Sequence, residues 1–281
     1  MDIGVIIFPT DTAIQPIELA KACEERGFES LWFPEHSHIP SSRETPWGGN
    51  PNLGPLPDMY WRTHDQFVAL TACAAVTEKL ILGTGITLVA QRDPIWLAKE
   101  VASLDMISGG RVEIGVGYGW NVEEMRNHGL DYKKRRAILR EYILLMKELW
   151  TKEEASFSGE HINLEASWAW PKPVSDPHPP IVMGGAAGPK TAAHIAEFCD
   201  GWMPLGGMYN VESGLLEIKE ACDKVGRDPA SIDLGMFFAM PPEADDIKAL
   251  PELGFKRAIL PLPPEGADTV LPILDQYAAF I

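Results

Sequence analysis

Residues 79–121 read KLILGTGITLVAQRDPIWLAKEVASLDMISGGRVEIGVGYGWN, and this stretch decides the fold. Two apolar runs, 79–88 and 111–117, flank a segment whose apolar residues recur at helical spacing. Pro94 suits the first turn of that helix, and Gly109 ends it. Near-continuous apolar strands joined by a helix are typical of a parallel sheet that is covered on both faces. The stretch therefore predicts a strand–helix–strand unit of an α/β fold.

The same alternation of strand and helix runs through the whole chain. The predicted strands are residues 3–8, 30–33, 79–88, 111–117, 180–185, 201–205, 231–240 and 256–262. The predicted helices are residues 16–26, 65–76, 93–106, 133–150, 189–199, 211–225, 244–252 and 268–280. Eight such units predict a (β/α)8 TIM barrel that forms a single domain over residues 1–281, with an open doubly wound sheet as the alternative. Insertions are expected after strands two and four, at residues 35–64 over the barrel mouth and at residues 152–178, where a hairpin is expected.

The charge balance restricts the class of partner. The chain has 24 basic and 40 acidic residues, which gives a formal net charge of -16. This excess repels phosphate backbones and anionic lipid surfaces, so neither a nucleic acid nor a membrane is expected as a partner. The N-terminal stretch MDIGVIIFPTD lacks the basic and long apolar regions of a signal peptide, and the four cysteines are far apart. We therefore expect a cytoplasmic protein with reduced thiols.

The end of the second strand carries the strongest titratable cluster. It reads SLWFPEHSHIP and places Glu35, His36 and His38 where a barrel has its catalytic face. A catalytic zinc needs about three protein ligands, and the later strand ends offer no further His, Asp, Glu or Cys, so no metal is predicted. Covalent catalysis is also disfavoured, because no lysine ends a strand and no Ser or Cys stands in a nucleophile elbow.

The glycine-rich strand ends favour a large planar cofactor. Glycines allow close approach of the backbone, and an apolar pocket with few polar groups suits a cofactor that brings its own chemistry. In GGAAGPKTAAHIA, residues 184–196, a strand passes through two glycines into a helix start, which offers backbone N–H groups to a phosphate. A tight turn without a ligand is the alternative. The stretch GVGYGWN lacks the third glycine of a dinucleotide fingerprint, so a Rossmann site is not predicted.

Several of these stretches, in this order, resemble the luciferase-like monooxygenase superfamily. They are GFESLWFPEH, the block from LILGTG to GWNVEE, the ELW after a long helix, PIVMGGAA and DGW. The resemblance covers about residues 3–205, continues more weakly through GFKRAILPLP, and is closest to the branch that uses the deazaflavin coenzyme F420. It implies an oxidoreductase that transfers a hydride between coenzyme F420 and a small organic substrate. A monooxygenase that uses reduced FMN with dioxygen is the alternative, and a non-catalytic flavin-binding or structural barrel is a remote one.

The resemblance also implies roles for individual residues. His36 would exchange a proton beside the reactive ring, and Glu35 would orient His36 or take part directly. A non-prolyl cis peptide bond would join Gly85 to Ile86. The residues expected to bind the cofactor, the last four at its ribityl phosphate end, are Gly85, Ile86, Thr87, Gly117, Tyr118, Gly119, Asn121, Gly184, Gly185, Ala186 and Trp202. Relatives are often dimers, so a homodimer is expected.

Two further segments are assigned to ligand binding. In the loop at residues 41–65, Trp47, Tyr60 and Trp61 are expected to form a lid and the apolar wall of the substrate pocket. The run KKRR at residues 133–136 places cations at a helix start, against the helix dipole, which suggests an anionic ligand. Coenzyme F420 has an acidic oligoglutamate tail, which this run, or Arg43 and Arg62, would attract. His38 is expected to be part of the loop structure, and the other histidines are given no chemical role.

Overall fold

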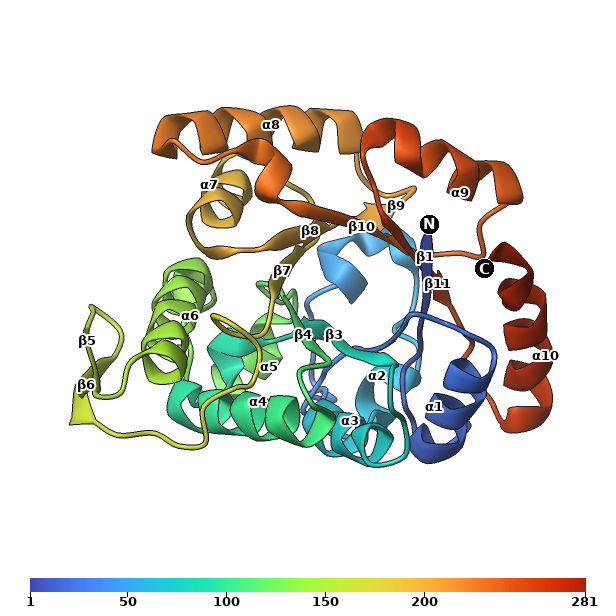
Figure 1. Ribbon diagram of the computed structural model, residues 1–281, viewed down its shortest axis with the longest axis horizontal. Helices are drawn as coiled ribbons and strands as arrows, with labels where there is room; N and C mark the ends of the chain where they lie inside the picture. The colour runs from blue at the N-terminus through green and yellow to red at the C-terminus, as the bar shows by residue number, and fades with distance from the viewer.

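The computed structural model describes residues 1–281, and its strands close into a parallel barrel surrounded by helices (Figure 1). The barrel strands are β1 (Asp2–Ile6), β2 (Ser30–Phe33), β3 (Ile81–Thr87), β4 (Val112–Val116), β7 (Ile181–Gly184), β8 (Gly201–Met203), β10 (Asp233–Phe238) and β11 (Arg257–Pro261). Each strand pairs in parallel with the next one named, and β11 pairs with β1 to close the ring. The prediction of a (β/α)8 barrel is confirmed.

A helix returns the chain after each barrel strand (Figure 1). These helices are α1 (Pro16–Glu25), α3 (Gln66–Ala74), α4 (Pro94–Ser108), α6 (Arg135–Thr151), α7 (Pro189–Phe198), α8 (Val211–Val225), α9 (Ala244–Ala249) and α10 (Ala267–Tyr277). Local sequence sets their ends, as in α4, where the Asp93 side chain accepts hydrogen bonds from the N–H groups of Ile95 and Trp96 and Gly109 adopts φ 71°. None of the helices has both the length and the hydrophobicity needed to cross a membrane.

One predicted strand is interrupted. Residues 201–205 were expected to form a single strand, but the chain divides into β8 and the short β9 (Leu205–Gly206) on either side of Pro204. Proline has no N–H to give to a sheet, so the ladder breaks there. Both pieces pair with β10, at its beginning and at its end.

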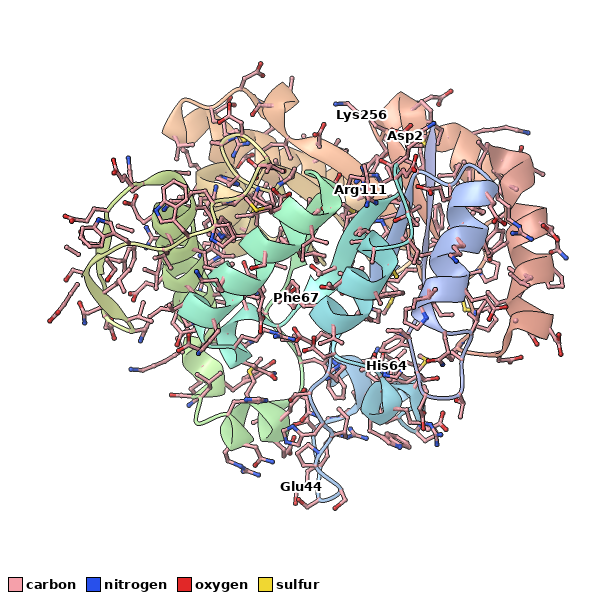
Figure 2. The ribbon with its side chains drawn as sticks, turned by 60° about the horizontal axis from the view of Figure 1, so that its bottom comes forward. Asp2, Glu44, His64, Phe67, Arg111 and Lys256 are labelled. Carbon is pink, nitrogen blue, oxygen red and sulfur yellow. The ribbon has the colours of Figure 1, made fainter.

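The long connections lie outside the barrel wall. The loop after β2 contains the 3-10 turns η1 (Trp47–Gly49) and η2 (Pro51–Leu53) and the short helix α2 (Met59–Arg62). Figure 2 shows Glu44 and His64 of this loop at one end of the molecule, and Asp2 and Lys256 at the other. The segment after α6 forms the expected hairpin, in which β5 (Ala155–Ser158) pairs antiparallel with β6 (Asn163–Ser167). The remaining short elements are η3 (Val89–Gln91), α5 (Val122–Asn127), η4 (Tyr132–Lys134), η5 (Pro229–Ser231), η6 (Leu250–Leu253) and η7 (Ala278–Phe280).

Large side chains fill the inside of the barrel. Trp32, Val182, Met203, Phe237 and Ile259 come from five different strands and pack together as a core of their own. The fully buried Trp32 lies against Gly83 of the neighbouring strand, where any side chain would overlap the indole ring. Beneath them the Arg257 guanidinium pairs with Glu29 and Glu113. A small pocket of about 120 Å³ remains at this lower end beside Glu113 and Arg257. The candidate site of a (β/α)8 barrel lies at the other end, where the strands have their carboxyl ends.

Replacing Gly83 by alanine should destabilise the fold, because the added carbon would lie 2.2 Å from Cε3 of Trp32. Overpacking usually costs about 1–3 kcal/mol, and we expect a loss at the upper end of that range in urea unfolding. Gly266→Ala is the matched control, since nothing lies within 4 Å of its added carbon, and it should change stability by less than about 1 kcal/mol. Equal losses in the two variants would contradict this account of the barrel interior.

Candidate active site

His36 follows β2 and is held by a buried carboxylate. Its Nδ1 lies 2.8 Å from Oε2 of Glu124, and the two side chains are 6% and 0% exposed. The other oxygen of Glu124 accepts a hydrogen bond from the N–H of Ser37 at 3.1 Å. Since a carboxylate only accepts hydrogen bonds, Nδ1 carries the proton in this pair. Nε2, which has no partner in the protein, is then the nitrogen available for proton exchange.

Glu124 lies on α5, and its position depends on a local cap. The side chain of Asn121 accepts a hydrogen bond from the N–H of Glu124 at 3.2 Å and begins this helix. Asn121 is itself fully buried, and its Nδ2 has no partner. The sequence showed GWNVEE directly after β4, but gave Glu124 no role. That prediction considered only the strand ends, whereas this acid reaches His36 from α5, three residues beyond Asn121.

An aromatic wall stands beside His36. The rings of Tyr60 and Trp120 lie 5.2 and 5.7 Å from the imidazole, centroid to centroid. Trp47 and Phe8 pack on Tyr60 at 5.9 and 4.7 Å. Burial raises the pKa of Tyr60, so its hydroxyl stays protonated at neutral pH. Trp47 and Tyr60, which were expected in a pocket wall, thus belong to one aromatic cluster with Trp120 of the loop after β4.

Glu35 points away from His36. Its Oε2 accepts a hydrogen bond from the N–H of Leu88 at 2.7 Å, and its Oε1 pairs with Arg92. Arg92 also pairs with Asp65 at 2.6 Å and Glu100 at 3.1 Å. Burial raises the pKa of the Glu35 carboxyl, and Arg92 opposes that rise. Both oxygens of Glu35 are thus held by other groups, so the carboxylate that orients His36 is Glu124 and not Glu35.

A polar pocket of about 330 Å³ adjoins His36. It is lined without any hydrophobic residue, by Glu35, His36, Ser37, Thr63, His64, Asp65, Gln91, Arg92 and His128. Nε2 of His128 lies 2.7 Å from the Ser37 hydroxyl, and Nε2 of Gln91 is buried without a partner. His64 and His128 had been given no role, and both belong to this site. His38 lies 2.9 Å from the same Ser37 hydroxyl and from Asn127, in agreement with a place in the loop structure.

The Gly85–Ile86 peptide bond is cis, and the side chain of Ile86 occupies the space over two neighbouring strand ends. A carbon added to Gly117 would lie 2.1 Å from Cδ1 of Ile86, and one added to Gly184 would lie 2.6 Å from its Cγ2. These two glycines therefore make room for Ile86. Thr87 faces the core, where it is fully buried and its hydroxyl donates to Gln66 at 2.5 Å.

The loop after β7 offers free backbone. Gly185 has φ 90°, space is open beside Gly185 and Gly188, and no side chain caps the start of α7. Trp202 was expected at this ligand surface, but it is fully buried and its indole N–H donates to the carbonyl of Gly185 at 2.8 Å. The large ring of Trp202 is packed in the core beneath the loop, and it supports the loop from there. Trp61 also differs from expectation, since it is half exposed and absent from the aromatic wall around His36.

The sequence profile of luciferase-like monooxygenases matches residues 9–272. The chain belongs to the luciferase-like monooxygenase family. An uncharacterized protein of Mycobacterium tuberculosis (strain ATCC 25618 / H37Rv) is 37% identical over 99% of this chain and 98% of its own length. The F420-dependent glucose-6-phosphate dehydrogenase of Nakamurella multipartita is 28% identical over 93% of this chain and 74% of that enzyme.

A solved structure agrees on the fold of this luciferase-like protein. The crystal structure of monooxygenase RslO1 from Streptomyces bottropensis covers 100% of this chain and 98% of that chain, with a TM-score of 0.78 at 20% identity. This likeness concerns the fold alone, because the same barrel supports many chemistries.

Breaking the buried pair of Glu35 should destabilise this luciferase-like protein. Arg92→Met would leave the carboxylate buried without its cation, and we expect a loss of about 3–5 kcal/mol in urea unfolding. Glu35→Gln combined with Arg92→Met should recover part of that loss, since the amide oxygen can still accept from Leu88. Arg26→Met is the control, because it breaks a more exposed pair with Asp275 and should cost less than about 1 kcal/mol. A double variant no more stable than Arg92→Met would contradict this account.

Proposed function

We propose that this luciferase-like protein is an oxidoreductase that transfers a hydride between coenzyme F420 and a small organic substrate. The observation that carries the proposal is the Glu124–His36 pair, buried at the carboxyl ends of the barrel strands and flanked by Tyr60 and Trp120. Such a pair supplies one positioned proton donor or acceptor beside an apolar wall. The F420-dependent glucose-6-phosphate dehydrogenase among its relatives supports the choice of cofactor.

The residues at the mouth fit such a cofactor. Gly185 and Gly188 leave open space at the uncapped start of α7, where backbone N–H groups suit a phosphate. Asn121 and Gln91 each keep a buried amide donor without a partner, which suits the carbonyl groups of a polar ring edge. Ile86 would support the ring from the barrel side. When bound, the deazaflavin supplies a carbon that accepts or gives a hydride.

The role of the side chains is to move and hold a proton. When a hydride leaves the carbon of an alcohol, the hydroxyl proton must leave as well, and Nε2 of His36 would accept it. Glu124 would stabilise the imidazolium formed in that step through the 2.8 Å hydrogen bond to Nδ1. In the reverse direction Nε2 returns the proton to the carbonyl oxygen. Trp47, Tyr60 and Trp120 would exclude water from the reacting atoms.

Reduced FMN with dioxygen is the second candidate. The description of the family refers to monooxygenases, and the structure of monooxygenase RslO1 matches this barrel over the whole chain. FMN has a ring and a phosphate like those of F420, so the same mouth would hold it. The carbon that replaces the flavin N5 makes a deazaflavin a poor partner for dioxygen, so the cofactor that binds decides between the two reactions.

Titration of the purified protein with F420 and FMN in parallel tests the choice of cofactor. Cofactor fluorescence reports binding, and we expect a Kd for F420 at least about tenfold below that for FMN, a difference of ~1.4 kcal/mol. Gly185→Val is the control. It should weaken the binding of both cofactors, because a branched side chain at φ 90° distorts the phosphate loop. Tight binding of FMN with none of F420 would establish the second candidate instead.

Replacing His36 by Asn should lower the single-turnover rate of hydride transfer about 100-fold or more, the usual contribution of a positioned acid or base. The substrate would come from a screen of small alcohols and aldehydes with the bound cofactor. Glu124→Gln should cause a smaller loss, because a neutral amide no longer stabilises the imidazolium formed in that step. His38→Asn is the control and should leave the rate unchanged. Normal turnover by His36→Asn would refute the proton-transfer role.

A further inference from the structure

Four cations form a basic patch in this otherwise acidic chain. They are Lys133, Arg135, Arg136 and Lys190, which we call the basic patch. No carboxylate pairs with any of them, although the chain has 40 acidic residues. Of their near neighbours in sequence, Lys134 makes a 3.8 Å pair with Glu160, and Asp131 uses its side chain to cap the backbone of Lys133. The positive charge of the patch is therefore left without internal compensation.

One cation of the patch is held against an aromatic ring. The guanidinium of Arg135 lies 3.5 Å from the ring centre of Tyr132 and donates to the Tyr132 carbonyl. Burial lowers the pKa of Arg135, and repulsion from Arg136 adds to that effect. Three of the four cations stand at the start of α6, where the helix dipole is also positive. An arrangement of this kind is unfavourable by itself, and a bound polyanion would relieve it.

The patch borders the candidate cofactor site. Arg136 donates to the hydroxyl of Thr191, in the first turn of α7, at 3.1 Å. Its guanidinium also lies 3.8 Å from the ring centre of Tyr118, which follows β4 and whose hydroxyl lies 2.9 Å from Nδ1 of His194. Lys190 stands in the same turn of α7, next to the open backbone of Gly185–Gly188. A chain of negative groups that is attached to a phosphate bound at this loop would reach the basic patch directly.

We propose that the basic patch binds the carboxylate-rich tail of the deazaflavin coenzyme. The inference rests on the proposed function, because FMN ends at its phosphate and has no group that could reach the patch. Arg and Lys side chains at a protein surface recognise carboxylates through charge and hydrogen bonds, and the effect is strongest at low ionic strength. The patch would thus raise the affinity for coenzyme F420 in a protein whose net charge otherwise repels it.

Three ligands with the same ring system separate the contributions of the ring, the phosphate and the glutamate tail to the binding affinity. They are the deazaflavin core with only its ribityl chain, the coenzyme with its phosphate but no glutamates, and the coenzyme with several glutamates. The test variant combines Lys133→Gln, Arg135→Gln and Lys190→Gln, and keeps Arg136 because it packs on Tyr118. The control combines Lys152→Gln, Lys219→Gln and Lys224→Gln, which are exposed and without an ion pair, so the two variants have the same net charge.

Binding is followed by fluorescence at low and high salt. At low salt we expect the unaltered protein to bind the long-tailed coenzyme about tenfold more tightly than the tail-free one, as a few exposed ion pairs would give. The patch variant should lose this preference while its affinity for the core stays unchanged, and the control variant should keep the preference.

Two results would overturn the inference while leaving the proposed function intact. One is equal binding of the long-tailed and tail-free coenzymes by the unaltered protein. The other is an equal loss of the preference in both variants, which would show a general effect of net charge. If none of the three deazaflavins binds, the proposed function fails and the inference fails with it.

Discussion

The buried carboxylate of Glu35 fixes the end of β2, and the geometry of the site depends on it. Its two oxygens are held by Arg92 and by the N–H of Leu88, both of which follow β3. Two neighbouring strands are thus tied together at the barrel mouth by a pair whose removal would leave an uncompensated buried charge. His36 is the next residue, and its Nδ1 lies 2.8 Å from the carboxylate of Glu124.

Two acids therefore have different structural roles at this strand end. Glu35 holds the backbone in place through its pair with Arg92, and Glu124 sets the proton on Nδ1 of His36. A site built on a strand end with a rigid anchor keeps its geometry better than one built on a free loop. The anchor at Glu35 thus holds the His36 imidazole in place at the start of a long loop.

Charge is distributed unevenly over the molecule. The chain has a formal net charge of -16, yet the basic patch leaves its cations unpaired beside the loop that suits a phosphate. Such local charge attracts an anionic ligand over a short range and is screened by salt, whereas the net charge acts on every partner. The surroundings of His36 and the basic patch thus differ in physical character, since the former are aromatic and polar and the latter is cationic.

The sequence by itself determined the barrel, and it placed the candidate site at the ends of the strands. The alternation of strand and helix patterns depends on residues close together in the chain, and so do caps such as Asp93 and Gly109. The amino-acid sequence therefore predicts these features. It also placed His36 at a strand end. Only the tertiary structure decided that Glu124, 88 residues away, would be its partner, that Trp202 would be buried and that Trp120 would join the aromatic wall. These facts depend on which loops meet when the barrel closes, and side-chain contacts between distant segments leave no periodic signal in the sequence.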